Sequence, residues 1–208
     1  MRTEAQYQFT LPVAVSKHSK RQSYVFDLIF KEILGINYQF ISANDSGKYL
    51  SYGSQPSEFF IQAHELMHQN SIEKQQLSFV SFENKSYPFK INGDKSLYPF
   101  DLFAVCFYTV TRYEEYFPVQ LDKHGRYRAE ESWLVSQGLL TQPIVHVLAE
   151  NLKQKIETYF GVKIKYKNQY YIEPTIDIDN AYAYFNSCLL YTSPSPRDGA
   201  TSRMPSSA

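Results

Sequence analysis

The sequence has little cysteine and no long apolar run. Its 208 residues include two cysteines, Cys106 and Cys188, and a single tryptophan. Cys106 lies in the apolar stretch LFAVCFYTV, where a buried thiol without a cationic neighbour is a core residue rather than a nucleophile. No segment reaches the roughly 20 apolar residues that a membrane-spanning helix needs. We therefore expect neither a disulfide framework nor a membrane span.

The chain also lacks an excess of charge of either sign. Lys and Arg together number 21, as do Asp and Glu. Because general nucleic-acid binding needs a basic face, this balance argues against a nucleic-acid partner. The opening residues, MRTEAQYQFTLPVAV, lack the apolar core of a signal peptide. We therefore expect a cytoplasmic location.

The last 21 residues, Cys188 to Ala208, do not read as natural protein. CLLYTSPSPRD back-translates without a mismatch into a transposon-end adapter used for DNA sequencing libraries, and SRMPSSA fits the companion adapter. Pro, Ser and Thr dominate the segment, so it lacks the apolar area that folding requires. We expect residues 188–208 to be a non-native, disordered tail, and the natural sequence to end near Ser187.

Aromatic residues are abundant. The 18 Tyr and 15 Phe supply much of the apolar area of a core, and buried Tyr hydroxyls need hydrogen-bond partners. A packed globular domain is therefore expected.

The first half of the chain predicts a strand, a helix and a second strand. Residues 9–16 alternate as a strand does, and Pro12 favours an edge position because it lacks a backbone donor. Apolar residues recur at helical spacing from about Ser19 to Leu34, and Gly35 stands where a helix would end. INYQFIS alternates again, NDSG is typical of a turn, and KYLSYG is expected to return as a hairpin partner.

The second half continues the alternation of helix and strand. LSFVSFENKSYPFK predicts two short strands, whereas EFFIQAHELM fits either the end of a strand or the start of a helix. The segment from Pro99 to Tyr116 is apolar nearly all round at first and predicts a buried helix with Pro99 in its first turn. Gln142 to Tyr159 is amphipathic, and KIKYKNQYYIEPTIDID returns to β patterning. The fold class is therefore α/β, a mixed sheet with flanking helices.

Two carboxylates close the last β-type run. In Thr175-Ile176-Asp177-Ile178-Asp179, alternation places Asp177 and Asp179 on one strand face. Neighbouring acids raise each other's pKa, and carboxylate oxygen is a zinc ligand, so the pair suits a base beside a metal. A solvated strand end with two acids is the alternative that spacing alone leaves open.

A second candidate is His64-Glu65-Leu66-Met67-His68. On an α-helix, H-E-x-x-H puts two imidazoles on one face with Glu65 as a general base, as in zinc metallopeptidases. A third ligand is not evident, because Ser71 and Lys74 stand where the extended motif has Gly and His. The alternative is that His64 and His68 form a chance match.

Charged clusters elsewhere predict structural pairing. Arg112-Tyr113-Glu114-Glu115-Tyr116 ends the predicted buried helix, and we expect its charges to pair with Lys123, Arg126 or Arg128. Lys17 to Arg21 reads as a solvated helix start, and Trp133 as a core anchor.

The motifs RYEEY, DKHGRY and PTIDID, in this order, resemble bacterial polysaccharide deacetylase family proteins that carry an N-terminal domain of unassigned role. The similarity runs from about Leu11 to Asn186. It implies a distorted (β/α) barrel in which a divalent metal, zinc or a similar ion, activates water against an acetyl group. Carried over, Asp177 is the general base and Asp179 the metal ligand, although the family's motif has adjacent aspartates followed by glycine.

The sequence thus predicts three parts: an α/β accessory domain over residues 1–170, the first strand of a truncated deacetylase barrel over 171–187, and the tail. No H-x-x-x-H follows Asp179, so we expect this chain to be inactive and to hold no catalytic metal. The parent would act on a polysaccharide. A glycan- or protein-binding module, or a zinc peptidase at His64, Glu65 and His68, are the alternatives.

Overall fold

The structure, a computed structural model, describes residues 9–42, 47–53, 57–118, 120–165 and 172–175. Contacts divide the chain into two units, Met1–Lys167 and Asn168–Ala208. In the second unit only residues 172–175 are described, and they have no regular secondary structure. Every helix and strand named below belongs to the first unit, and none of them is long and apolar enough to cross a membrane.

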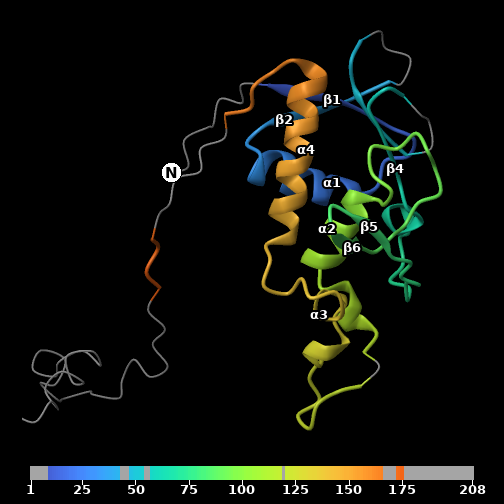
Figure 1. The fold of residues 1–208 in the computed structure, drawn as a ribbon, viewed down its shortest axis with the longest axis vertical. Coiled ribbons are helices and arrows are strands. Elements are labelled where there is room, and N and C mark those ends of the chain that lie inside the picture. The colour runs from blue at the N-terminus through green and yellow to red at the C-terminus, as the bar shows by residue number, and fades with distance from the viewer. Residues whose placement is uncertain (1–8, 43–46, 54–56, 119, 166–171, 176–208) are drawn as a thin grey trace, which may run out of the picture. The chain divides into compact units, whose positions relative to one another are not determined.

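Four parallel strands form the main sheet of the described domain, in the order β2-β1-β3-β4. Figure 1 labels β1, β2 and β4 of this sheet. A separate antiparallel hairpin joins β5 and β6. The mixed α/β fold class is confirmed. The strands are β1 (Thr10–Val15), β2 (Asn37–Ile41), β3 (Leu50–Gly53), β4 (Phe60–Gln62), β5 (Val80–Phe82) and β6 (Lys85–Tyr87).

Pro12 lies in a central strand, so the prediction of an edge position was wrong. β1 pairs with β2 from Thr10 onward, but its pairing with β3 begins only at Val13. Ser16, directly after β1, donates its backbone N–H to Tyr52 O in β3. Backbone N–H groups alternate in direction along a strand, so the nitrogen of Pro12, four residues earlier, points to the same side. Pairing with β3 begins only at Val13, so no ladder donor is needed at Pro12.

The predicted hairpin between INYQFIS and KYLSYG does not form. β3 pairs in parallel with β1, on the side opposite β2. Local alternation is the same for a hairpin and for a crossover, so the sequence pattern did not distinguish the two. The two short strands predicted in LSFVSFENKSYPFK are confirmed as β5 and β6, which pair as a hairpin. Glu83 and Asn84 between them both adopt positive φ, as a tight two-residue turn requires.

The first predicted helix is confirmed in extent and changes type along its length. α1 (Lys20–Phe26) begins with a capping box, in which Ser19 and Gln22 bond each other's backbone N–H. It continues as a π-helix, η1 (Asp27–Ile33), and ends before Gly35 at φ +64°. Gly35 supplies the left-handed residue that terminates a helix.

The buried helix starts later than predicted. α2 (Leu102–Val110) is capped by Asp101, so Pro99 lies before the helix rather than in its first turn. Short helical turns lie before and after α2 in the chain, and the long helix α4 begins just after Pro143. These elements are η2 (Glu65–His68), η3 (Tyr113–Tyr116), η4 (Ala129–Glu131), α3 (Trp133–Ser136) and α4 (Ile144–Phe160).

The last turn of α4 packs against residues that precede the strands. Phe160 meets Phe9 edge to face, and Tyr159 stacks on Phe59 with ring centroids 4.8 Å apart. Phe9 and Phe59 stand just ahead of β1 and β4. α4 therefore covers the amino ends of these strands, and the carboxyl ends lie at the opposite edge. After α4, residues 162–165 form no strand, so the predicted return to β structure is not seen there.

Candidate functional site

A cavity of about 870 Å³ opens at the carboxyl ends of β1, β3 and β4. β2 and β3 lie on opposite sides of β1, so the strand order reverses between β1 and β3. Open parallel sheets bind ligands at such a switch point, outside the carboxyl ends of the strands. The lining residues are Ser16, Lys17, Gly53, Phe60, Gln62, Ala63, Glu65, His68, Gly93, Asp94 and Lys95.

Two glycines bring the cavity walls close together. A Cβ on Gly53 would overlap the side chain of Ser16, and Gly53 has a φ of +140°, which L residues rarely adopt. A Cβ on Gly93 would overlap Oε1 of Gln62. The Ser16 side chain therefore lies against the backbone of Gly53, and the Gln62 amide lies against the backbone of Gly93.

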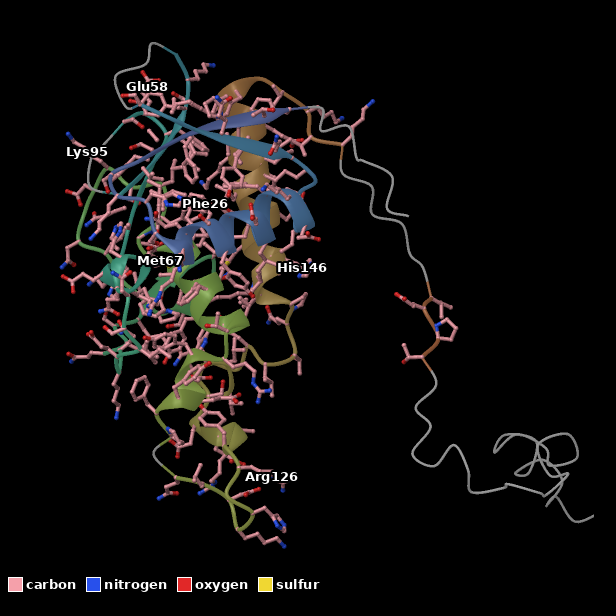
Figure 2. The ribbon with its side chains drawn as sticks, turned by 180° about the vertical axis from the view of Figure 1, so that it is seen from behind. Phe26, Glu58, Met67, Lys95, Arg126 and His146 are labelled. Atoms are coloured by element: carbon pink, nitrogen blue, oxygen red, sulfur yellow. The ribbon has the colours of Figure 1, made fainter. Side chains whose placement is uncertain are left out.

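The charges around the cavity are balanced. Lys17 and Lys95 contribute two cations, and Glu65 and Asp94 two anions. Figure 2 labels Lys95 and shows it at the margin of the domain. Burial, helped by nearby Lys17, lowers the pKa of His68 and keeps its imidazole neutral near pH 7. The His68 side chain lines the cavity, and its buried Nδ1 atom has no hydrogen-bond partner among the described residues.

Asp101 is a fully buried carboxylate that connects three elements behind the cavity. Its Oδ1 accepts hydrogen bonds from the backbone N–H of Phe103 (3.0 Å) and Ala104 (3.2 Å), which caps α2. Its Oδ2 accepts from the Tyr52 hydroxyl (2.8 Å) and the His64 N–H (2.7 Å). Burial raises its pKa to about 6, against the opposing effect of these four donors.

Asp101 fixes the positions of two cavity segments. Tyr52 immediately precedes Gly53, and His64 lies between Ala63 and Glu65, all three of which line the cavity. Sequence reasoning missed this residue, although an Asp directly before an apolar helical run is a recognisable N-cap signal.

The zinc-peptidase arrangement at His64 and His68 is absent. β4 ends at Gln62, and Glu65–His68 forms one turn of 3-10 helix rather than an α-helix. His64 caps that turn, and its Nδ1 accepts from the Leu66 N–H at 3.2 Å. Among the described residues no group of three or more His, Cys, Asp or Glu is placed to hold a metal ion. The helical geometry on which this alternative depends is therefore contradicted.

Arg21 ties α1 to this turn and to α2. Its guanidinium donates to Leu66 O (2.8 Å) and Ser71 O (2.7 Å). It also lies over the rings of Phe107 and Tyr113, at 5.2 and 5.4 Å from their centroids. The basic run before α1 is thus partly structural, contrary to the solvated helix start that the sequence predicted.

The charged cluster after α2 pairs differently from the prediction. Arg112 bonds Glu115 within the cluster. Glu114 accepts from the Ser132 hydroxyl (2.6 Å) and from the Trp133 N–H (3.0 Å), so it caps α3. Arg126 and Arg128 bond partners in their own loop instead. Trp133 is 3% exposed, which confirms it as a core anchor.

Asp177 and Asp179 lie outside the described residues. Their assignment as general base and metal ligand stays a prediction, as do the 171–187 barrel strand and the nature of residues 188–208.

The structure is a mixed α/β domain with a cavity at the carboxyl ends of its parallel strands. Residues 11–161 match a protein family described as a family of unknown function, DUF7033, and the chain belongs to that family. No curated protein and no solved structure matches the chain.

Proposed function

We propose that the described domain is a non-catalytic module that binds a neutral glycan in the cavity at the carboxyl ends of β1, β3 and β4. The observation that supports this most is the lining. It pairs two cations with two anions and adds the Ser16 hydroxyl, the Gln62 amide and the His68 imidazole. Such a surface offers many donors and acceptors without a net field, which suits a polyhydroxylated ligand.

The proposal does not use an exposed stripe of aromatic residues as the glycan-binding surface. Tyr52, Tyr87 and Tyr98 are buried in the core, whereas Tyr24 and Tyr116 are exposed. The polar cavity is therefore the better candidate for recognition than the aromatic surface.

Titration calorimetry with an oligosaccharide of N-acetylglucosamine tests the proposal. Gln62→Ala removes one amide from the wall and should weaken binding about 5- to 30-fold, the loss expected for one or two hydrogen bonds. Gln39→Ala, at an exposed position on β2, is the matched control and should leave the affinity unchanged. Absence of binding, or equal loss in both variants, would contradict the proposal.

We further propose that the parent protein is a metal-dependent polysaccharide deacetylase in which this domain precedes the catalytic barrel. The support is the resemblance carried by RYEEY, DKHGRY and PTIDID. In the parent, Asp177 would act as base and Asp179 would be one ligand of a divalent metal such as zinc. The metal would supply the activation of water.

An intact gene product separates this second proposal from the first. Release of acetate from an acetylated glycan should stop on chelation, and should be lost in both Asp177→Asn and Asp179→Asn. The chain itself should bind zinc no tighter than millimolar. One-to-one micromolar binding that Asp177→Ala abolishes would show a complete metal site here and would contradict the expected inactivity.

A further inference from the structure

A second, smaller cavity of about 250 Å³ has a lining of different chemistry. It lies between the irregular segment before β5, the end of α2 with η3, and the start of α3. Five aromatic side chains contribute to its wall: Phe79, Tyr108, Phe117, Tyr127 and Trp133. Aromatic faces carry negative partial charge, and a group of them around a small space attracts cations.

Two carboxylates strengthen that preference. Glu114 and Glu131 line the same cavity, against one cation, Lys74. Glu131 forms no ion pair in the part of the chain that the structure describes. After the larger effect of burial, the charge of Glu114 raises the pKa of Tyr108 and of Tyr127, and Glu131 adds to the effect at Tyr127. Carboxylates therefore outnumber cations in this lining.

One wall group lacks a partner. The Tyr127 hydroxyl is buried and makes no hydrogen bond to any described residue. Glu114, by contrast, holds Ser132 and the Trp133 N–H, so α3 keeps the indole of Trp133 in place. The cavity thus has an aromatic lining that includes Trp133 and a carboxylate, Glu131, that forms no ion pair with any described residue.

We propose that this cavity binds a small organic cation, an ammonium group with carbon substituents. The aromatic faces contact the carbon shell, and Glu131 and Glu114 balance the charge. This inference does not rest on the glycan-binding proposal, because the two cavities share no lining residue. The cation can be a quaternary ammonium compound or a protonated amino sugar, which share the charge and differ in their hydroxyls.

Trp133 is the only tryptophan in the chain and lines the cavity, so its fluorescence reports occupancy directly. The probes are choline and protonated glucosamine. Their neutral counterparts are the tert-butyl analogue of choline and N-acetylglucosamine. At constant ionic strength, at least one cation should change the emission saturably, with a dissociation constant of about 0.1–1 mM for a ligand of this size. Its neutral counterpart should bind at least tenfold more weakly. The tighter cation identifies the source.

Removing a carboxylate and removing the cation of the lining should change the affinity for the cation in opposite directions. Glu131→Gln should weaken cation binding about three- to tenfold, and Lys74→Gln should strengthen it. Glu130→Gln, which removes a carboxylate bonded to Arg128 that does not line the cavity, should have no effect. The proposal is overturned if neither cation binds, if each neutral counterpart binds as well as its cation, or if Glu130→Gln and Glu131→Gln weaken binding equally.

Discussion

The hydroxyl of Tyr52 donates a 2.8 Å hydrogen bond to the carboxylate of Asp101, and both side chains are buried. Tyr52 belongs to β3 and Asp101 caps α2, so the bond joins the central sheet to the buried helix. The same carboxylate holds the backbone of His64. This bond therefore links the packing of the core to the position of the cavity wall.

Tyr52→Phe should destabilise the domain. Removing the hydroxyl deletes a hydrogen bond to a buried carboxylate, and the expected loss is about 1.5–3 kcal/mol in the free energy of unfolding. Urea denaturation followed by circular dichroism measures it. Tyr24→Phe, at a half-exposed position on α1, is the control and should change the value by less than about 0.5 kcal/mol. Equal stability of the two variants would refute the structural role of the bond.

Asp101 should make stability depend on pH in an unusual direction. Its pKa is about 6 in the folded protein because of burial, above the ordinary 3.8. A raised folded-state pKa contributes stability that is complete below the unfolded-state pKa and is lost as the pH rises through about 6. The free energy of unfolding of the wild-type protein, measured relative to that of Asp101→Asn, should therefore rise by up to about 2–3 kcal/mol as the pH falls from 7 to 4.

The titration of His64 changes the stability in the opposite direction over the same pH range. Burial lowers the pKa of His64 from 6.5, so its contribution is present above pH 6.5 and is lost as the pH falls through its folded-state value. Comparing the two proteins at each pH cancels the His64 contribution. A difference between wild type and Asp101→Asn that stayed constant from pH 4 to pH 7 would rule out the raised pKa.

Glu114 and its neighbour Glu115 should differ in their effect on stability. Glu114→Gln leaves one acceptor oxygen for the two donors that now bond its carboxylate, at Ser132 and Trp133. We expect a loss of about 1–2 kcal/mol and a red shift of Trp133 emission. Glu115→Gln breaks only an ion pair with exposed Arg112, which is worth about 0–1 kcal/mol. The reverse order of stability would show that Glu114 does not cap α3.

Two glycines with nearly the same φ allow the cost of backbone strain to be separated from the cost of side-chain crowding. Gly47 and Gly53 have φ of +139° and +140°, but a Cβ meets nothing within 4 Å at Gly47 and overlaps Ser16 at Gly53. Each change to Ala should cost about 1–3 kcal/mol for backbone strain, and Gly53→Ala about 1–3 kcal/mol more for overpacking. Ser16→Gly should recover part of that excess. Equal losses at both positions would show that the ends of β1 and β3 are not in close contact.

Much of the local structure could be predicted from sequence because its causes are local. Ser19 and Gly35 bound the first helix through capping chemistry, and Glu83-Asn84 forms the turn between the two predicted short strands. Trp133 is buried, as its size and apolar character suggest. Each of these features depends on residues within a few positions of one another.

The sheet order and the cavity could not be predicted in the same way. Placing β3 beside β1 rather than β2 depends on how helices pack over the sheet, which alternation in a strand does not encode. The cavity combines Ser16, Gln62 and Lys95, far apart in the sequence. His64 and His68 matched a zinc motif by spacing alone, but the strand β4 leaves only one turn of 3-10 helix for them.

The most direct test of the central claim is a titration of the isotope-labelled chain with a neutral N-acetylglucosamine oligosaccharide, followed by backbone amide chemical shifts. The account predicts saturable shifts concentrated at Ser16, Gly53, Gln62 and Gly93, around the carboxyl ends of the parallel strands. No saturable shifts, or shifts concentrated around Tyr159 at the opposite edge of the sheet, would contradict it.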